Sequence, residues 1–140
     1  MVDQRVQDDE VEAAIAAREA LRPTVWTGHL ILYGTDAERS ATFYEIVGMR
    51  RVAVMAPFAV MELRGGTHLV LRHAPPRRAT REAPFDLMYD DVGAMRRRCQ
   101  ALGLRPTALK RGRIHDVFRF VGPGRHRFTV FSSHASSRSV

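Results

Sequence analysis

A chain of 140 residues, 45% hydrophobic and 26% charged, is suited to one globular domain with a packed core. No stretch approaches the roughly 18 to 20 apolar residues that cross a bilayer, and the N-terminus is acidic where a signal peptide would be basic, so we expect a soluble, cytoplasmic protein with no membrane partner. Cys99 is the only cysteine, which excludes an internal disulfide and a clustered thiolate metal site, and the net charge of +7 comes from dispersed arginines, which argues against a nucleic-acid partner.

The N-terminal segment predicts an amphipathic helix that precedes the rest of the domain. Apolar residues such as Val11 and Ile15 recur on a rough helical period over residues 8–21, and Pro23 stands just past the end. We therefore assign residues 1–24 to an N-terminal helix and linker. Its apolar stripe is expected to pack against the domain or against a partner subunit.

The next segment follows a strand, helix and three-strand order. Residues 26–33 are apolar or β-prone throughout, which predicts a strand buried on both faces. Asp36 is a good N-cap for a helix over 37–47 that turns Ile46 inward with its other apolar residues, and Gly48 supplies the left-handed turn that ends it. Three short strands are then predicted at residues 51–55, 58–63 and 68–73.

After a proline-rich linker at 74–83 the same order starts again. Asp91 caps a helix that runs to about Leu102, and Gly103 ends it. The strands expected in this half lie at 85–89, 107–111, 115–120 and 127–131.

The matching spacing indicates an internal duplication. Twelve positions separate Asp36 from Gly48, and twelve separate Asp91 from Gly103. A half-repeat alone exposes one face of its sheet, so two must pair to enclose that surface. We predict an α+β domain over 25–134, made of two βαβββ half-repeats (25–74 and 84–134) whose mixed sheets form a cup, with the extra N-terminal helix before it and a flexible serine-rich tail at 135–140.

Three stretches carry a family resemblance. They read GHLILYGTD at 28–36, SATFYEIVGM at 40–49 and FVGPGRHRFT at 120–129. Because these stretches occur in this order in a duplicated chain, the sequence resembles the vicinal oxygen chelate (glyoxalase/bleomycin resistance/dioxygenase) superfamily. The resemblance implies a cup that binds a small molecule, and it implies a homodimer.

The resemblance also implies four positions for a divalent metal, and most of them here cannot bind one. They fall on His29, Val70, Pro84 and Thr129. Valine and proline offer no lone pair and a threonine hydroxyl is a poor ligand, so we expect no metal cofactor. If a metal is bound, the ligand set left open is His29, His68 and Asp86.

We therefore expect a small-molecule binding protein of the glyoxalase/bleomycin-resistance type whose ligand is anionic or aromatic. The alternative is a metal-dependent or acid/base enzyme of the same superfamily, a lyase, isomerase or dioxygenase, with His29 or His115 as the catalytic candidate. A third alternative is an interaction module whose N-terminal helix docks a partner. The residues predicted to line the cup are His29, Tyr33, His68, Arg72, Asp86, Met88, His115 and Thr129.

Other residues carry structural predictions. His126, at the last turn, is expected to be exposed, and the run 96–98 of three arginines is expected to lie on a solvated helix face. Five strand residues are of the kind that either fills a core or lines an apolar ligand pocket, and the core is the preferred expectation for each: Trp26, Tyr33, Met55, Met61 and Met88.

Overall fold

The computed structural model describes residues 3–21 and 23–133, so the predicted tail at 135–140 and residue 134 of the predicted domain lie outside it. Residues 27–133 belong to one compact unit, and helix α1 (Gln4–Ala20) lies outside that unit. The side chain of Asp3 accepts a hydrogen bond from the backbone of Arg5, so the helix begins four residues before the predicted start at residue 8.

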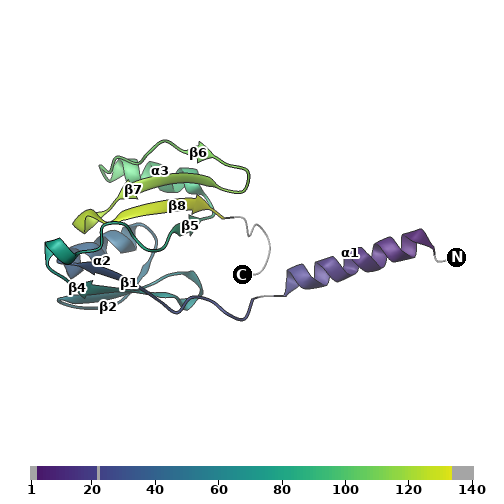
Figure 1. Ribbon diagram of the computed structural model, residues 1–140, viewed down its shortest axis with the longest axis horizontal. Coiled ribbons are helices and arrows are strands. Elements are labelled where there is room, and N and C mark those ends of the chain that lie inside the picture. Colours follow the sequence, from purple (N-terminus) through teal and green to yellow (C-terminus); the bar gives the residue numbers. More distant parts are fainter. Residues whose placement is uncertain (1–2, 22, 134–140) are drawn as a thin grey trace. The chain divides into compact units, whose positions relative to one another are not determined.

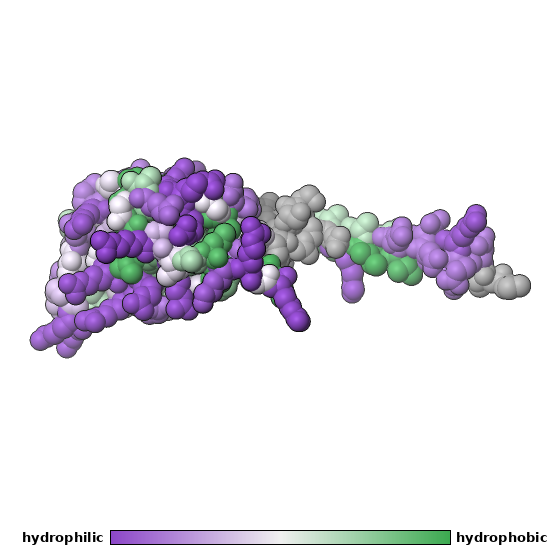
Figure 2. All heavy atoms as spheres, turned by 90° about the horizontal axis from the view of Figure 1, so that it is seen from above, coloured by the Kyte–Doolittle hydropathy of each residue, from purple (hydrophilic) through white to green (hydrophobic). Residues whose placement is uncertain are grey.

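Helix α1 carries an exposed apolar stripe. Val11 and Ile15 are both more than half exposed, and apolar atoms interrupt its otherwise hydrophilic surface in Figure 2. No helix among the described residues is both long and apolar enough to span a membrane.

The first half-repeat forms a four-stranded mixed sheet in the order β1-β4-β3-β2. Strands β1 and β4 are parallel, and the other neighbours are antiparallel. Asp36 caps helix α2 by accepting from the backbone of Arg39, as its position predicts. The elements are β1 (His29–Gly34), α2 (Ala37–Ile46), β2 (Arg50–Met55), β3 (Phe58–Glu62), the short helix η1 (Arg64–Gly66) and β4 (His68–His73).

The second half-repeat has the same topology, in the order β5-β8-β7-β6, and Figure 1 shows the two sheets as separate layers. Its helix is again capped by an aspartate, Asp91. The elements are η2 (Pro76–Arg78) in the linker, then β5 (Leu87–Tyr89), α3 (Val92–Ala101), β6 (Lys110–Arg111), β7 (Asp116–Val121), η3 (Pro123–Arg125) and β8 (Arg127–Ser132). The predicted α+β fold with two βαβββ half-repeats and an extra N-terminal helix is confirmed.

Helix α2 packs against both sheets and so joins the halves. It covers one face of its own sheet. On its other side, the ring centres of Phe43 and Phe120 are 6.1 Å apart, and those of Tyr44 and Phe128 are also 6.1 Å apart. Ile46 is not turned inward as predicted but is partly exposed. The shared core is completed by Leu32, Met61, Leu69, Leu71, Phe118 and Val130.

His126 is buried, so the prediction of an exposed histidine is wrong. Its side chain has no exposed surface because the turn η3 packs onto α2. Nε2 lies 2.9 Å from the backbone oxygen of Tyr33, which can only accept, so Nε2 carries the hydrogen. Nδ1 then accepts from the hydroxyl of Tyr44 at 3.0 Å. One imidazole thus links η3 of the second half to β1 and α2 of the first.

The backbone carbonyls at the C-terminal end of α2 accept hydrogen bonds from side chains of the second half-repeat. The hydroxyl of Tyr89 donates to the carbonyl of Val47 at 2.7 Å, and Arg98 donates to the carbonyl of Ile46 at 2.9 Å. Arg96 donates to the carbonyl of Thr107 at 2.8 Å. Arg97 and Arg98 are exposed, as predicted for a solvated face, and Arg96 is half-buried; Arg96 and Arg98 also anchor neighbouring segments through these bonds.

Candidate functional site

Each sheet has a covered face and an open face, and the open face of the first sheet carries the candidate site. Alternate residues of β1 and β4 such as Leu32, Leu69 and Leu71 are fully buried beneath α2. The residues between them point the other way and are partly exposed. The prediction that β1 is buried on both faces is wrong, since His29 is exposed and the side chain of Tyr33 is 42% exposed.

Strand register arranges this open face as three rows that cross the sheet. The polar row has His29 opposite His68, His68 opposite Glu62, and Glu62 opposite Arg50. The apolar row, in the middle, consists of Ile31, Val70, Val60 and Ala53. The aromatic row has Tyr33 opposite Arg72 and Phe58 opposite Met55.

The polar row is a connected set of charged and titratable groups. Arg50 donates from Nε to Oε2 of Glu62 at 2.7 Å and contacts the same oxygen through Nη2. The other carboxylate oxygen, Oε1, lies 3.9 Å from Nε2 of His68. The rings of His68 and His29 are 5.7 Å apart. An arginine, a carboxylate and two imidazoles therefore succeed one another across four strands.

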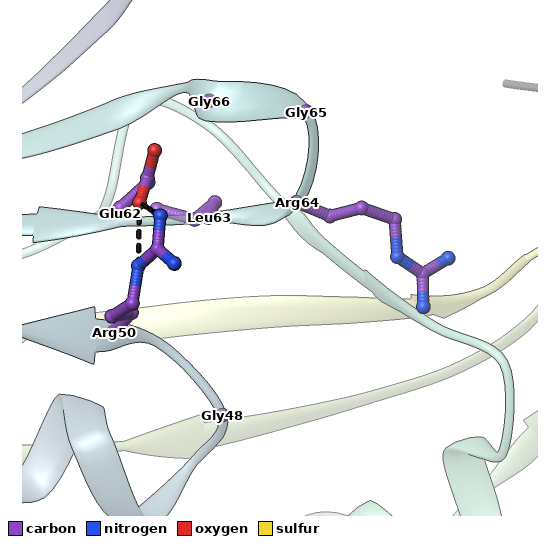
Figure 3. A pocket seen from close by; sticks show the side chains of 7 residues that line it. All are labelled: Gly48, Arg50, Glu62, Leu63, Arg64, Gly65 and Gly66. Carbon is purple, nitrogen blue, oxygen red and sulfur yellow. Dashed lines mark hydrogen bonds and ion pairs between the residues drawn. The ribbon is translucent and has the colours of Figure 1, made fainter.

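A shallow cleft of about 380 Å³ adjoins the polar row at the turn after β3. Figure 3 shows Arg50 and Glu62 paired at its edge, with Arg64 extending away from them. Arg64 instead pairs with Asp90 of the second half-repeat at 2.7 Å, and this contact lowers the pKa of the Asp90 carboxyl. Both carboxylates near the cleft are therefore neutralised by arginines.

The aromatic row ends the open face with the cationic side chain of Arg72. No hydrogen bond or ion pair joins the guanidinium of Arg72 to any residue that the structure describes. Tyr33 and Phe58 share the row and are each roughly half exposed. A flat apolar group with a negative charge can contact all three side chains at once.

The second sheet has an open face of different composition. Met88 lies opposite Phe131, and Thr129 lies opposite Arg119. The side chain of Met88 is 51% exposed. This face therefore combines apolar surface with two arginines, Arg119 and Arg127, and does not repeat the succession of arginine, carboxylate and imidazoles of the polar row.

The predicted site residues thus divide between the two sheets. His29, Tyr33, His68 and Arg72 share the first open face, and Met88 and Thr129 lie on the second. Asp86 is exposed just before β5. His115 precedes β7, where its Nδ1 lies 2.6 Å from the carbonyl oxygen of Ser132 and its ring packs edge-on against Phe131.

The structure does not bring together the three metal ligands proposed from the sequence, His29, His68 and Asp86. Within residues 3–21 and 23–133, no three histidine, cysteine, aspartate or glutamate side chains lie close enough to hold a metal ion, so His29, His68 and Asp86 do not converge. Val70 and Thr129 occupy open faces, where the resemblance places metal ligands, but neither fits that role.

Sequence reasoning placed some residues wrongly and missed others. Of the five strand residues predicted for the core, only Met61 is buried; Trp26, Tyr33, Met55 and Met88 are exposed. Arg50, Glu62 and Phe58 were not predicted for the site. The alternation over 58–62 is a signal that could have placed Phe58 and Glu62 on one face, but it does not identify the neighbouring strands.

No family model matches this sequence, and no curated protein matches it. Solved structures do match. TnmS3, an antibiotic-binding protein from Streptomyces sp. CB03234, is 21% identical with a TM-score of 0.67 over 80% of this chain and 98% of that one. A bleomycin-binding protein in complex with bleomycin is 20% identical with a TM-score of 0.61 over 79% and 100%. The oxidase ChaP-H2 is 22% identical with a TM-score of 0.64 over 82% and 98%. At these identities the likeness establishes the fold, which is the one that the resemblance predicted.

Proposed function

We propose that this protein binds an anionic or aromatic small molecule on its open sheet faces, without the metal site usual in the superfamily that it resembles. The observation that carries the proposal is the first open face, where a half-buried apolar row separates the polar row from the aromatic row, in which the Arg72 guanidinium pairs with no residue that the structure describes. Two proteins of the same fold are described as binding an antibiotic and bleomycin, which supports a ligand-binding role.

The aromatic row supports the ligand class. Arg72 has no carboxylate to neutralise it among the described residues, so an anionic group would supply the missing partner. Tyr33 and Phe58 offer flat apolar surface beside it. The net charge of +7 adds a long-range attraction for anions.

The exposed apolar side chains support a homodimer. Met55 is 69% exposed and Met88 51%, and exposed apolar side chains of this size are unfavourable in water. We propose that the open face of one copy covers that of a second copy and so closes the cup. Sedimentation velocity tests this: a dimer is expected, and a monomer at all concentrations with the ligand site intact would contradict it.

An acid/base enzyme is the alternative, and the polar row favours it. His29 and His68 are accessible imidazoles beside a carboxylate, as proton transfer requires, and one protein of this fold is an oxidase. A metal-dependent lyase, isomerase or dioxygenase fits the residues less well, since Val70 and Pro84 stand at two of the four implied ligand positions.

The ligand proposal is tested with 8-anilinonaphthalene-1-sulfonate, a fluorescent aromatic anion, titrated against native protein. Losing a charge-assisted hydrogen bond costs about 1.5 to 3 kcal/mol, so Arg72→Gln should raise the Kd about 10- to 150-fold. Arg39→Gln is the matched control, because Arg39 is exposed on α2, which covers the opposite face. Equal Kd values for the two variants would contradict the proposal.

A further inference from the structure

We propose that His68, which lies beside the Glu62 carboxylate, accepts the proton of a weakly acidic hydroxyl on the ligand, so that a phenol or enol is bound as its anion. The inference rests on the proposed function and assigns the polar row a chemical role. It defines the ligand class as an extended aromatic molecule with a phenol or enol at one end and a permanent anionic group, for Arg72, at the other.

The carboxylate between Arg50 and His68 has two differently occupied oxygens. Both contacts from Arg50 reach Oε2 of Glu62, which leaves Oε1 facing Nε2 of His68 at 3.9 Å. At this distance the carboxylate makes no hydrogen bond to the ring, but its charge favours the tautomer with the hydrogen on Nε2, and in that tautomer the lone pair lies on Nδ1. Glu62 is also placed to stabilise the positive charge that His68 gains with a second proton.

The surroundings leave His68 accessible to a ligand. Its side chain is 36% exposed, while that of Glu62 is 19% exposed. The titratable and charged groups that face it are His29 from β1, Glu62 from β3 and, behind Glu62, Arg50 from β2. Helix α2 lies on the covered face of the sheet and contributes none.

The proton transfer is balanced without any further reactant. The O–H bond of the ligand breaks, its proton binds Nδ1 of His68, and the electron pair stays on the ligand oxygen. Nothing is oxidised or reduced, and the step reverses when the ligand leaves. The bound state is an oxyanion beside an imidazolium that is itself beside a carboxylate.

Strand geometry sets the length of the ligand. His68 and Arg72 are four residues apart on β4, and at about 3.3 Å per residue this is about 13 Å. The apolar row lies between them, with Val70 on the same strand flanked by Ile31 and Val60. A rigid molecule of linked rings with a polar group at each end matches this pattern.

The test uses 7-hydroxycoumarin-3-carboxylate, whose phenol and phenolate forms have different excitation bands and whose carboxylate lies at the opposite end. Bound to native protein at fixed pH, the ratio of phenolate to phenol should rise about tenfold over that of the free probe, which corresponds to a shift of one unit in its acidity. His68→Gln and Glu62→Gln should each bind the probe with the ratio near that of the free probe. His73→Gln is the matched control, since His73 ends the same strand, and it should keep the native ratio.

The outcomes separate this inference from the proposed function. Probe that binds native protein with no change in ratio overturns the proton transfer and leaves the ligand site standing. A shift that persists in both His68→Gln and Glu62→Gln also overturns it, because the cause would then be the general positive field of the site. Absence of any binding overturns the proposed function and this inference with it. Because two variants on different strands test the same transfer, the misfolding of one leaves the other decisive.

Discussion

The hydrogen bond between Tyr44 and His126 should be a measurable part of what holds the two half-repeats together. The Tyr44 hydroxyl donates to Nδ1 at 3.0 Å, and neither side chain is more than 1% exposed. In Tyr44→Phe the ring packing remains but Nδ1 loses its donor, and water has no access to replace it. An unsatisfied buried group of this kind costs about 1 to 3 kcal/mol. For a domain of this size that lowers the Tm by about 4 °C per kcal/mol.

The assay is urea unfolding followed by circular dichroism, arranged as a double-mutant cycle with His126→Phe. In the His126→Phe background no acceptor remains, so Tyr44→Phe should be nearly neutral, and the coupling free energy should be about 1 kcal/mol or more. The carbonyl of Tyr33 keeps its second donor, the backbone of Thr80, in that background. Tyr33→Phe is the control for a hydroxyl on the open face. An equal cost of Tyr44→Phe in both backgrounds would refute the reasoning.

Three further predictions concern the same core. Burial raises the pKa of the Cys99 thiol to about 11, so it should react with thiol reagents at neutral pH only after denaturant is added, and fast labelling of native protein would contradict this. Burial also raises the pKa of Tyr89 to about 12 and that of Tyr44 above its ordinary range, so between pH 10 and 12 the unfolded state binds fewer protons and the urea midpoint should fall as pH rises; a flat profile would contradict it. A Cβ at Gly122 would lie 3.0 Å from the ring of Phe43, so Gly122→Ala should lower the free energy of unfolding by about 1 to 3 kcal/mol, whereas Gly28→Ala, with open space around it, should not.

The fold could be predicted because its strongest signals are local. Asp36 and Asp91 cap their helices through side-chain bonds to backbone groups three residues on, and such bonds depend only on nearby sequence. Positive φ angles at Gly48 and Gly103 end the same helices. Because the same strand and helix signals occur twice in the same order, they indicate a duplication. The two halves then share one strand order in their sheets.

The site could be predicted only in part, because its geometry depends on distant pairings. His29 and His68 lie in register although 39 positions separate them in the chain, and nothing local specifies that pairing. His126 follows a Gly-Pro-Gly turn of the kind usually found at the surface, and only its contacts with Tyr44 and the backbone of Tyr33 explain its burial. Long-range contacts outweighed local tendency at each of these positions.

Because the two half-repeats share one backbone fold, any difference in function between them must come from the side-chain rows on their open faces. Strands β4 and β8 are six residues each with equivalent pairings, so His68 corresponds to Arg127 and Arg72 to Phe131. In the second half-repeat Arg127 pairs with Glu82 at 3.6 Å, and no imidazole stands in that row among the described residues. The same sheet thus supports a proton-accepting row in one half and a neutralised ion pair in the other. Exchanging the two rows by mutation would leave the hydrogen-bonded ladder unchanged, so any change in ligand chemistry would come from these side chains alone.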